Sequence, residues 1–269
     1  MSTWVLLRGL MRESRHWGEF PRQLHSAMGM QAVVTLDFPG NGSLHMQTSA
    51  RSVAGMAEHC RTQLRQLGYH PPYRVLALSL GAMAAVEWSR CHPAEIDRLV
   101  LINTSLAPYS PFYHRLRPAN YPALLHFLIH GSPVWRERLI LQLTSRLERS
   151  AHQQDELLRQ WVSYAQEFPV SRGNVLRQLR AAISYQASLT PPQVPLLLLA
   201  SQRDRLVDVR CSSALAQHWG CPLRLHTEAG HDLPLDDGTW VVRQITEWIA
   251  RDAGDANEGK SLGDASAPR

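Results

Sequence analysis

The sequence lacks any hydrophobic run long enough to cross a membrane. Its longest apolar stretch, residues 194–200, has the length of a strand, whereas a spanning helix needs roughly 20 apolar residues. The amino-terminal segment also lacks the basic start, apolar core and small-residue cleavage site of a signal peptide. We therefore expect a cytosolic protein that does not associate with a membrane.

Cysteine is scarce, and its spacing carries no metal-binding pattern. Cys60, Cys91, Cys211 and Cys221 form neither a C-x-x-C pair nor a zinc-finger arrangement. Scattered cysteines in a cytosolic protein are usually reduced packing residues. The sequence therefore predicts no structural disulfide, no metal site and no cofactor.

The chain is basic but lacks a basic cluster. Its formal net charge is +5, and Lys260 is its only lysine, so nearly all the cations are arginines. These arginines are dispersed among apolar helical positions and form no basic run interleaved with aromatic residues. We therefore expect no nucleic-acid partner, while acidic partners stay possible.

What is present is an alternation of short apolar runs with amphipathic helical stretches. This pattern is typical of a parallel sheet covered by helices on both faces. Six strands are predicted, at residues 3–8, 32–37, 74–78, 98–103, 194–200 and 223–227. Helices are predicted between and after them, at residues 17–28, 50–67, 80–91, 208–219 and 240–250.

One long interval, between Ser105 and Pro192, contains no candidate buried strand. It holds four amphipathic segments instead, at residues 121–130, 133–147, 154–168 and 175–189. We interpret residues 106–191 as a helical lid inserted after the fourth predicted strand, with residues 1–105 and 192–251 as the α/β core. Residues 252–269 are polar and without periodicity, which predicts a disordered tail.

The strongest local signal surrounds Ser79. An apolar strand runs into Ser79, which is flanked by Ala77 and Gly81, and a helix follows at once. Such a sharp turn strains the serine backbone and exposes its hydroxyl at the sheet edge, as in a nucleophile elbow. An ordinary helix start capped by the serine is the alternative reading.

A serine nucleophile needs a general base and a group that orients the base. Asp204 and His231 each follow a predicted strand, and the order Ser, Asp, His lets all three converge at one sheet edge. Asp208 is the rival acid, but it lies further from the strand, where helix capping explains it. Asp232 follows the histidine directly and should point away.

Two backbone amides are candidates for an oxyanion hole, which stabilises the charge of the tetrahedral intermediate. The turn at the serine places the amide of Leu80. The loop after the first strand offers Leu10, because Gly9 lets that amide turn inward.

Taken together, these pieces resemble the α/β-hydrolase superfamily, and within it lidded carboxylesterases such as the pimeloyl-carrier-protein methyl esterases and C–C bond hydrolases. The resemblance is carried by ordered segments along nearly the whole chain apart from the lid: residues 7–10, 37–42, 78–81, 92–95, 204–207 and 229–231. One departure is Arg8-Gly9, where family members usually have His-Gly.

The resemblance implies a serine hydrolase that cleaves an ester or thioester of a small to medium apolar acyl substrate through an acyl-enzyme. Gly9, Phe127, Trp135 and Trp161 are candidate substrate contacts, although core packing would equally explain the three aromatic residues. The alternatives are a C–C hydrolase or lyase that uses the same triad, and a ligand-binding protein without turnover.

The lid also carries a group of arginines. They could dock an acidic acyl carrier protein, or they could simply form a solvated helix face: Arg136, Arg138, Arg146, Arg149 and Arg159.

Overall fold

A six-stranded, fully parallel sheet forms the centre of the computed structural model, which describes residues 2–129, 132–146 and 148–263. Its strands lie in the order β2-β1-β3-β4-β5-β6. They are β1 (Thr3–Leu7), β2 (Val33–Leu36), β3 (Tyr73–Leu78), β4 (Ile96–Ile102), β5 (Leu196–Ser201) and β6 (Leu223–His226). The predicted α/β class and all six predicted strands are therefore confirmed.

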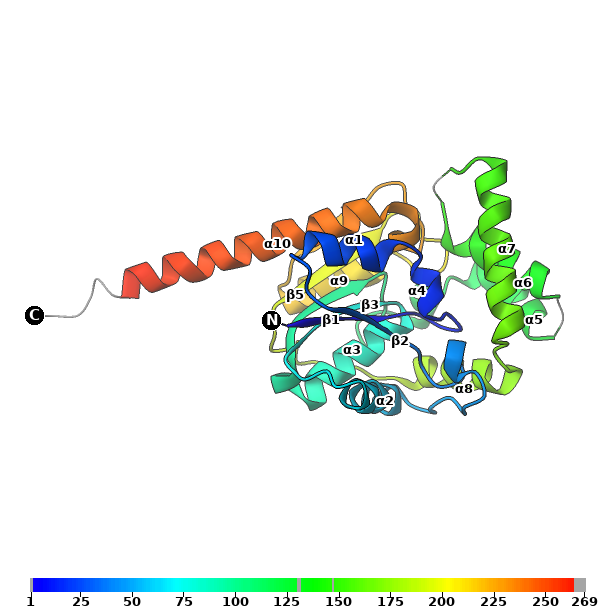
Figure 1. Ribbon diagram of the computed structural model, residues 1–269, viewed down its shortest axis with the longest axis horizontal. Coiled ribbons are helices and arrows are strands. Elements are labelled where there is room, and N and C mark those ends of the chain that lie inside the picture. Colours follow the sequence, from blue (N-terminus) through cyan, green and yellow to red (C-terminus); the bar gives the residue numbers. More distant parts are fainter. Residues whose placement is uncertain (1, 130–131, 147, 264–269) are drawn as a thin grey trace, which may run out of the picture.

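Helices cover both faces of this sheet (Figure 1). One face is covered by α1 (Phe20–Ala27) and α10 (Leu233–Gly263), and the other by α2 (Val53–Gln66), α3 (Leu80–Cys91) and α9 (Arg210–Trp219). Between β4 and β5 lie α4 (Phe112–Arg115), α5 (Tyr121–Ile129), α6 (Pro133–Thr144), α7 (Ala151–Glu167) and α8 (Arg172–Ser184). Of these, α5, α6 and α7 stand beyond the end of the sheet opposite the amino terminus (Figure 1).

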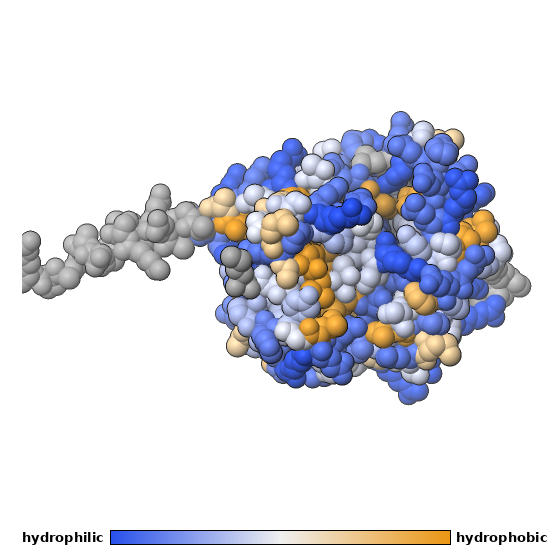
Figure 2. Space-filling model, viewed as in Figure 1, coloured by the Kyte–Doolittle hydropathy of each residue, from blue (hydrophilic) through white to orange (hydrophobic). Residues whose placement is uncertain are grey.

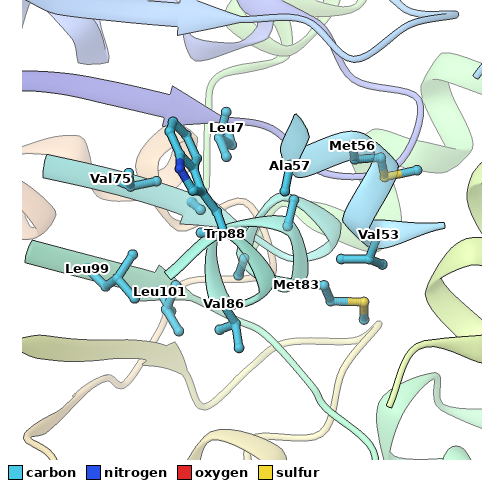
Figure 3. Close-up of a cluster of buried hydrophobic side chains, with 14 of the residues drawn as sticks. Leu7, Val53, Met56, Ala57, Val75, Met83, Val86, Trp88, Leu99 and Leu101 are labelled. Carbon is cyan, nitrogen blue, oxygen red and sulfur yellow. The ribbon is translucent and has the colours of Figure 1, made fainter. Parts of the chain in front are cut away.

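The helices bury both faces of the sheet, and alternate side chains of each strand point to opposite faces. Val5 and Leu7 of β1 belong to the core beneath α2 and α3, whereas Trp4 and Leu6 belong to the core beneath α1 and α10. Figure 3 shows the first of these cores, where Trp88 of α3 lies among side chains of the strands. The view in Figure 2 is mainly hydrophilic, with only small hydrophobic areas.

The last helix differs most from the prediction. It begins at Leu233, has a non-helical residue at Asp237 (φ −148°, ψ 74°), and continues to Gly263. Residues 252–263 are thus helical in the structure, whereas the sequence predicts a disordered tail from residue 252, and that disorder stays a prediction. The ends of two predicted lid helices, at residues 130 and 147, and the last part of the predicted tail, residues 264–269, lie outside the described residues.

Candidate functional site

Ser79 lies in a strained turn between β3 and α3. Its backbone has φ 57° and ψ −115°, and its amide donates to the carbonyl of Ile102 at 3.0 Å. A positive φ is unfavourable for a residue with a side chain, and such strain is often found at functional sites. The strained backbone that a nucleophile elbow requires is therefore present at Ser79.

Two glycines make this turn possible. A Cβ atom on Gly81 would lie 2.5 Å from the carbonyl oxygen of Leu7 and 2.6 Å from that of Arg8, so α3 can approach β1 this closely only without a side chain. A Cβ atom on Gly9 would lie 3.2 Å from the Cβ of Ser79. The loop after β1 therefore lies directly beside the serine.

Asp204 and His231 form a buried hydrogen-bonded pair. The Nδ1 atom of His231 lies 2.7 Å from Oδ2 of Asp204, and both residues are at most 5% exposed. The other carboxylate oxygen, Oδ1, accepts from the amides of Leu206 and Val207 at 2.7 and 3.0 Å. The carboxylate is thereby fixed, and the Nε2 atom of His231 remains as its second reactive nitrogen.

The environment of His231 favours its protonated form. Burial lowers the pKa of His231, but the charge of Asp204, the hydrogen bond to it and the charge of Asp232 together outweigh burial. Arg8 acts in the opposite direction, and the net result is a pKa raised above the usual value of 6.5. A neighbouring carboxylate shifts a histidine toward the charged state that a general base reaches after taking up a proton.

Asn103 connects the histidine loop to the strand beside Ser79. It follows β4 directly, is 3% exposed, and its Nδ2 donates to the carbonyl of His231 at 2.8 Å. Its Oδ1 accepts from the amide of Ser201 at 2.8 Å. Because the preceding residue, Ile102, binds the amide of Ser79, these contacts bring Ser79 and the histidine loop to the same edge of the sheet.

The rival acid Asp208 has a different role. Its Oδ1 accepts from the amide of Arg210 at 3.0 Å, and its side chain also forms ion pairs with Arg210 and Arg117. The hydrogen bonds from Arg210 hold the pKa of Asp208 well below its ordinary value. Asp208 thus bonds the amide of the first residue of α9, as expected at a helix start, although the N-cap itself is Val209.

The two candidate oxyanion donors come from the start of α3 and from the loop after β1. Leu80 is the first residue of α3, where a backbone N–H has no acceptor within the helix. Leu10 follows Gly9, the glycine that lies against the serine. Within the described residues, neither amide takes part in the backbone hydrogen bonds of turns and caps.

The candidate substrate contacts occupy different environments. Phe127 lines a pocket between the loop after β1 and α5, α6 and α7, together with Met11, Ile140 and Phe168. Trp161 is 2% exposed and lies beneath the guanidinium of Arg12, 4.1 Å from its ring centre. Trp135 packs against His126, with 4.5 Å between ring centres.

The fold agrees with comparisons to known proteins. A model of the alpha/beta hydrolase family matches residues 4–244. The chain belongs to the α/β-hydrolase family. Membership indicates hydrolytic chemistry without naming the bond that is cleaved. The narrower resemblance to carrier-protein methyl esterases stays a prediction.

Solved structures share this α/β-hydrolase fold at low sequence identity. The 2-hydroxy-6-oxo-6-phenylhexa-2,4-dienoate hydrolase of Rhodococcus sp. strain RHA1 has a TM-score of 0.75 at 17% identity, covering 93% of this chain and 90% of that one. A thermophilic esterase from Thermogutta terrifontis has a TM-score of 0.72 at 18% identity, covering 93% and 90%. A hydrolase from Pseudomonas aeruginosa PA01 has a TM-score of 0.72 at 17% identity, covering 92% and 89%. No curated protein sequence matches the chain.

Three further observations concern membrane spans, metal ligands and cysteines. Among the described residues, no helix of this α/β-hydrolase is long and apolar enough to cross a membrane. The same part of the chain contains no group of three or more histidine, cysteine or acidic residues that could hold a metal ion. All four cysteines have free thiols.

Proposed function

We propose that the protein is a serine hydrolase that cleaves an ester or thioester of a small to medium apolar acyl group. In this mechanism Ser79 attacks the carbonyl carbon while Nε2 of His231 takes the serine proton. Asp204 holds the tautomer of the imidazole and stabilises the imidazolium. The observation that carries the proposal is the buried 2.7 Å hydrogen bond between His231 and Asp204, in a loop tied to the strand beside the strained serine.

The reaction would proceed through an acyl-enzyme. The amides of Leu80 and Leu10 would stabilise the oxyanion of the tetrahedral intermediate. When that intermediate collapses, His231 would give its proton to the leaving group, and the acyl group would stay on Ser79. Water, deprotonated by His231, would then attack the acyl-enzyme, and His231 would return the proton to Ser79 as the acid leaves.

We propose that the acyl group lies in the pocket beside the loop after β1. Phe127 of α5, Ile140 of α6, Phe168 after α7 and Val175 of α8 give this pocket an apolar part. Ser79 and His231 are not among its lining residues, and charged residues line it as well: Glu13, Arg136, Glu137 and Arg172. We propose that these helices act as a lid over the site, and that Gly9 and the pocket-lining Phe127 contact substrate. Trp135 and Trp161 contact other side chains, so a supporting role in the lid fits them better.

Hydrolysis of p-nitrophenyl esters of increasing acyl length tests the proposal. The wild type should hydrolyse these esters, and Ser79→Ala and His231→Gln should each lose on the order of 10⁴-fold or more in kcat. Retained turnover in Ser79→Ala would contradict the proposed nucleophile. Ester binding without turnover by the wild type would favour the alternative of a ligand-binding protein.

Cleavage of a C–C bond is the second candidate reaction. The Rhodococcus dienoate hydrolase shares the fold along most of both chains. A dienoate of that class is therefore the second substrate to test. Turnover of the dienoate together with inertness toward all p-nitrophenyl esters would replace the esterase proposal.

An acyl carrier protein remains a proposed partner. Of the lid arginines, Arg149 is held by Ser145 and Asp236, and the guanidinium of Arg136 lies over the ring of Phe127. Arg138 and Arg159 are exposed and would carry the docking. Activity on a carrier-linked ester that does not change with salt would contradict electrostatic docking.

A further inference from the structure

A buried ion pair joins the end of β1 to the residue after His231. Arg8 donates from Nη1 to Oδ1 of Asp232 at 3.1 Å and from Nη2 to Oδ2 at 2.5 Å. The two side chains are 2% and 4% exposed, and the guanidinium lies 4.7 Å from the ring centre of Trp17. Two parallel hydrogen bonds fix both the distance and the relative orientation of the partners.

This pair lies between the two loops that carry the proposed chemistry. Arg8 is followed by Gly9, which lies against Ser79, and then by Leu10, a proposed oxyanion donor. Asp232 directly follows His231. A shift of the Arg8–Asp232 contact would therefore move the oxyanion loop relative to the base.

The backbone of each partner is also held. The carbonyl of Arg8 packs on Gly81 in the first turn of α3, and the amide of Asp232 donates to the carbonyl of Thr144 at the end of α6 at 2.8 Å. Both ends of the contact are thus attached to elements around the site.

A buried ion pair is weak evidence of a stabilising role. Burying two charges costs free energy that their attraction does not always repay, and apolar replacements of buried pairs are often as stable or more stable. A bidentate ion pair instead provides a defined geometry and a local field. The charged groups that act on His231 are Asp204 from the loop after β5, the adjacent Asp232, and Arg8 from the end of β1.

We propose that Arg8 and Asp232 are positioning residues, which hold the loop of His231 at a fixed distance from the oxyanion loop beside Ser79. This inference rests on the proposed function, because it assigns roles relative to the same nucleophile and base.

The pH dependence of kcat/KM in Asp232→Asn and Arg8→Gln tests the proposal. Each change should lower kcat by roughly 10²-fold with little change in KM, because small displacements of catalytic groups cost rate. Asp232→Asn removes a negative charge near the imidazolium and should move the acid limb of the kcat/KM profile, where activity falls as His231 is protonated, to lower pH. Arg8→Gln removes a positive charge and should move it to higher pH.

Glu95→Gln is the matched control. Glu95 forms a similar double contact with Arg61, at 2.7 and 2.6 Å, between α2 and the turn before β4. This variant should lose thermal stability while its kcat and acid limb stay as in the wild type. If the two site variants lose no more kcat than the control and their acid limbs do not move, the pair only stabilises the fold and the proposal fails.

Two further measurements keep the test decisive. Arg8→Lys keeps the charge but loses the two-nitrogen geometry of the guanidinium, so kcat should fall while the acid limb of the pH profile stays near its wild-type position. A wild-type kcat in this variant would contradict positioning by the bidentate contact. The pKa of His231, followed by NMR of its ring, needs no turnover. A wild type that hydrolyses nothing would overturn the proposed function. In that case, opposite shifts of the His231 pKa in Asp232→Asn and Arg8→Gln would still support the role of Arg8 and Asp232 beside His231. Unmoved pKa values in both variants would overturn that role.

Discussion

Replacement of Gly81 by alanine is expected to damage both stability and activity, although alanine is the better helix former. Gly81 is the second residue of α3, and an alanine Cβ would lie 2.5 Å from the carbonyl oxygen of Leu7 and 2.6 Å from that of Arg8. Both atoms belong to the backbone, so neither can rotate away. The substitution must push α3 and the end of β1 apart.

The size of the effect follows from two opposing contributions. Alanine in place of glycine stabilises a helix interior by about 1 kcal/mol. Overpacking of a close contact typically costs about 1–3 kcal/mol, and contacts this short with two carbonyl groups place Gly81→Ala at the upper end. We therefore expect a net loss of about 2 kcal/mol in the free energy of unfolding. Displacement of the Leu80 amide should lower kcat on the order of 10²-fold.

Urea unfolding and ester hydrolysis of the same preparation measure both effects. Gly173→Ala is the control, because the one close contact of its Cβ would be with Nη1 at the flexible end of Arg177, at 2.9 Å. That variant should be as stable as the wild type or up to about 1 kcal/mol more stable. A Gly81→Ala protein with wild-type stability and full activity would refute the close approach of α3 and β1.

Three other predictions concern the base and its surroundings. Because the pKa of His231 is raised above 6.5, lowering the pH should reduce kcat/KM with a midpoint above pH 6.5, and a flat activity profile would count against His231 as base. The protonated imidazole should stabilise the fold below pH 6.5, and this stability should be lost as the pH rises through the raised pKa. Asp204→Asn should lower kcat on the order of 10⁴-fold, whereas Asp208→Asn should leave it near the wild-type value. Steady-state kinetics that show the large loss in Asp208→Asn instead would contradict Asp204 as the residue that orients His231. Asn103→Ala should lower the free energy of unfolding by about 1–3 kcal/mol, because it leaves the buried amide of Ser201 without its acceptor, and an unchanged denaturation midpoint would show that these hydrogen bonds contribute nothing.

The sheet could be predicted from the sequence because its strands are short, apolar and buried on both faces. Helix α3 matches its prediction at both ends, since Ser79 stands directly before it and Pro93 closely follows its end. The end of α10 could not be predicted in this way. Beyond residue 252 the sequence has no apolar stripe, so periodicity gives no sign of the helix that extends to Gly263.

Only part of the site could be predicted from the sequence, because local patterns do not show long-range contacts. Asp204 and His231 were identifiable because each follows a strand, and strand ends meet at one edge of a parallel sheet. The contact between Arg8 and Asp232 joins residues 224 positions apart, and no local pattern predicts such a pairing. Asn103 carried a weak signal, as a polar residue directly after an apolar strand.

The proposed mechanism requires Ser79 to be a nucleophile activated by His231 and Asp204. A fluorophosphonate reacts with such a serine, and proteolysis and mass spectrometry of the labelled peptide identify the modified residue. We expect one covalent adduct on Ser79 in the wild type, none in Ser79→Ala and much slower labelling in His231→Gln. An adduct on another residue, or labelling that persists in Ser79→Ala, would contradict this mechanism.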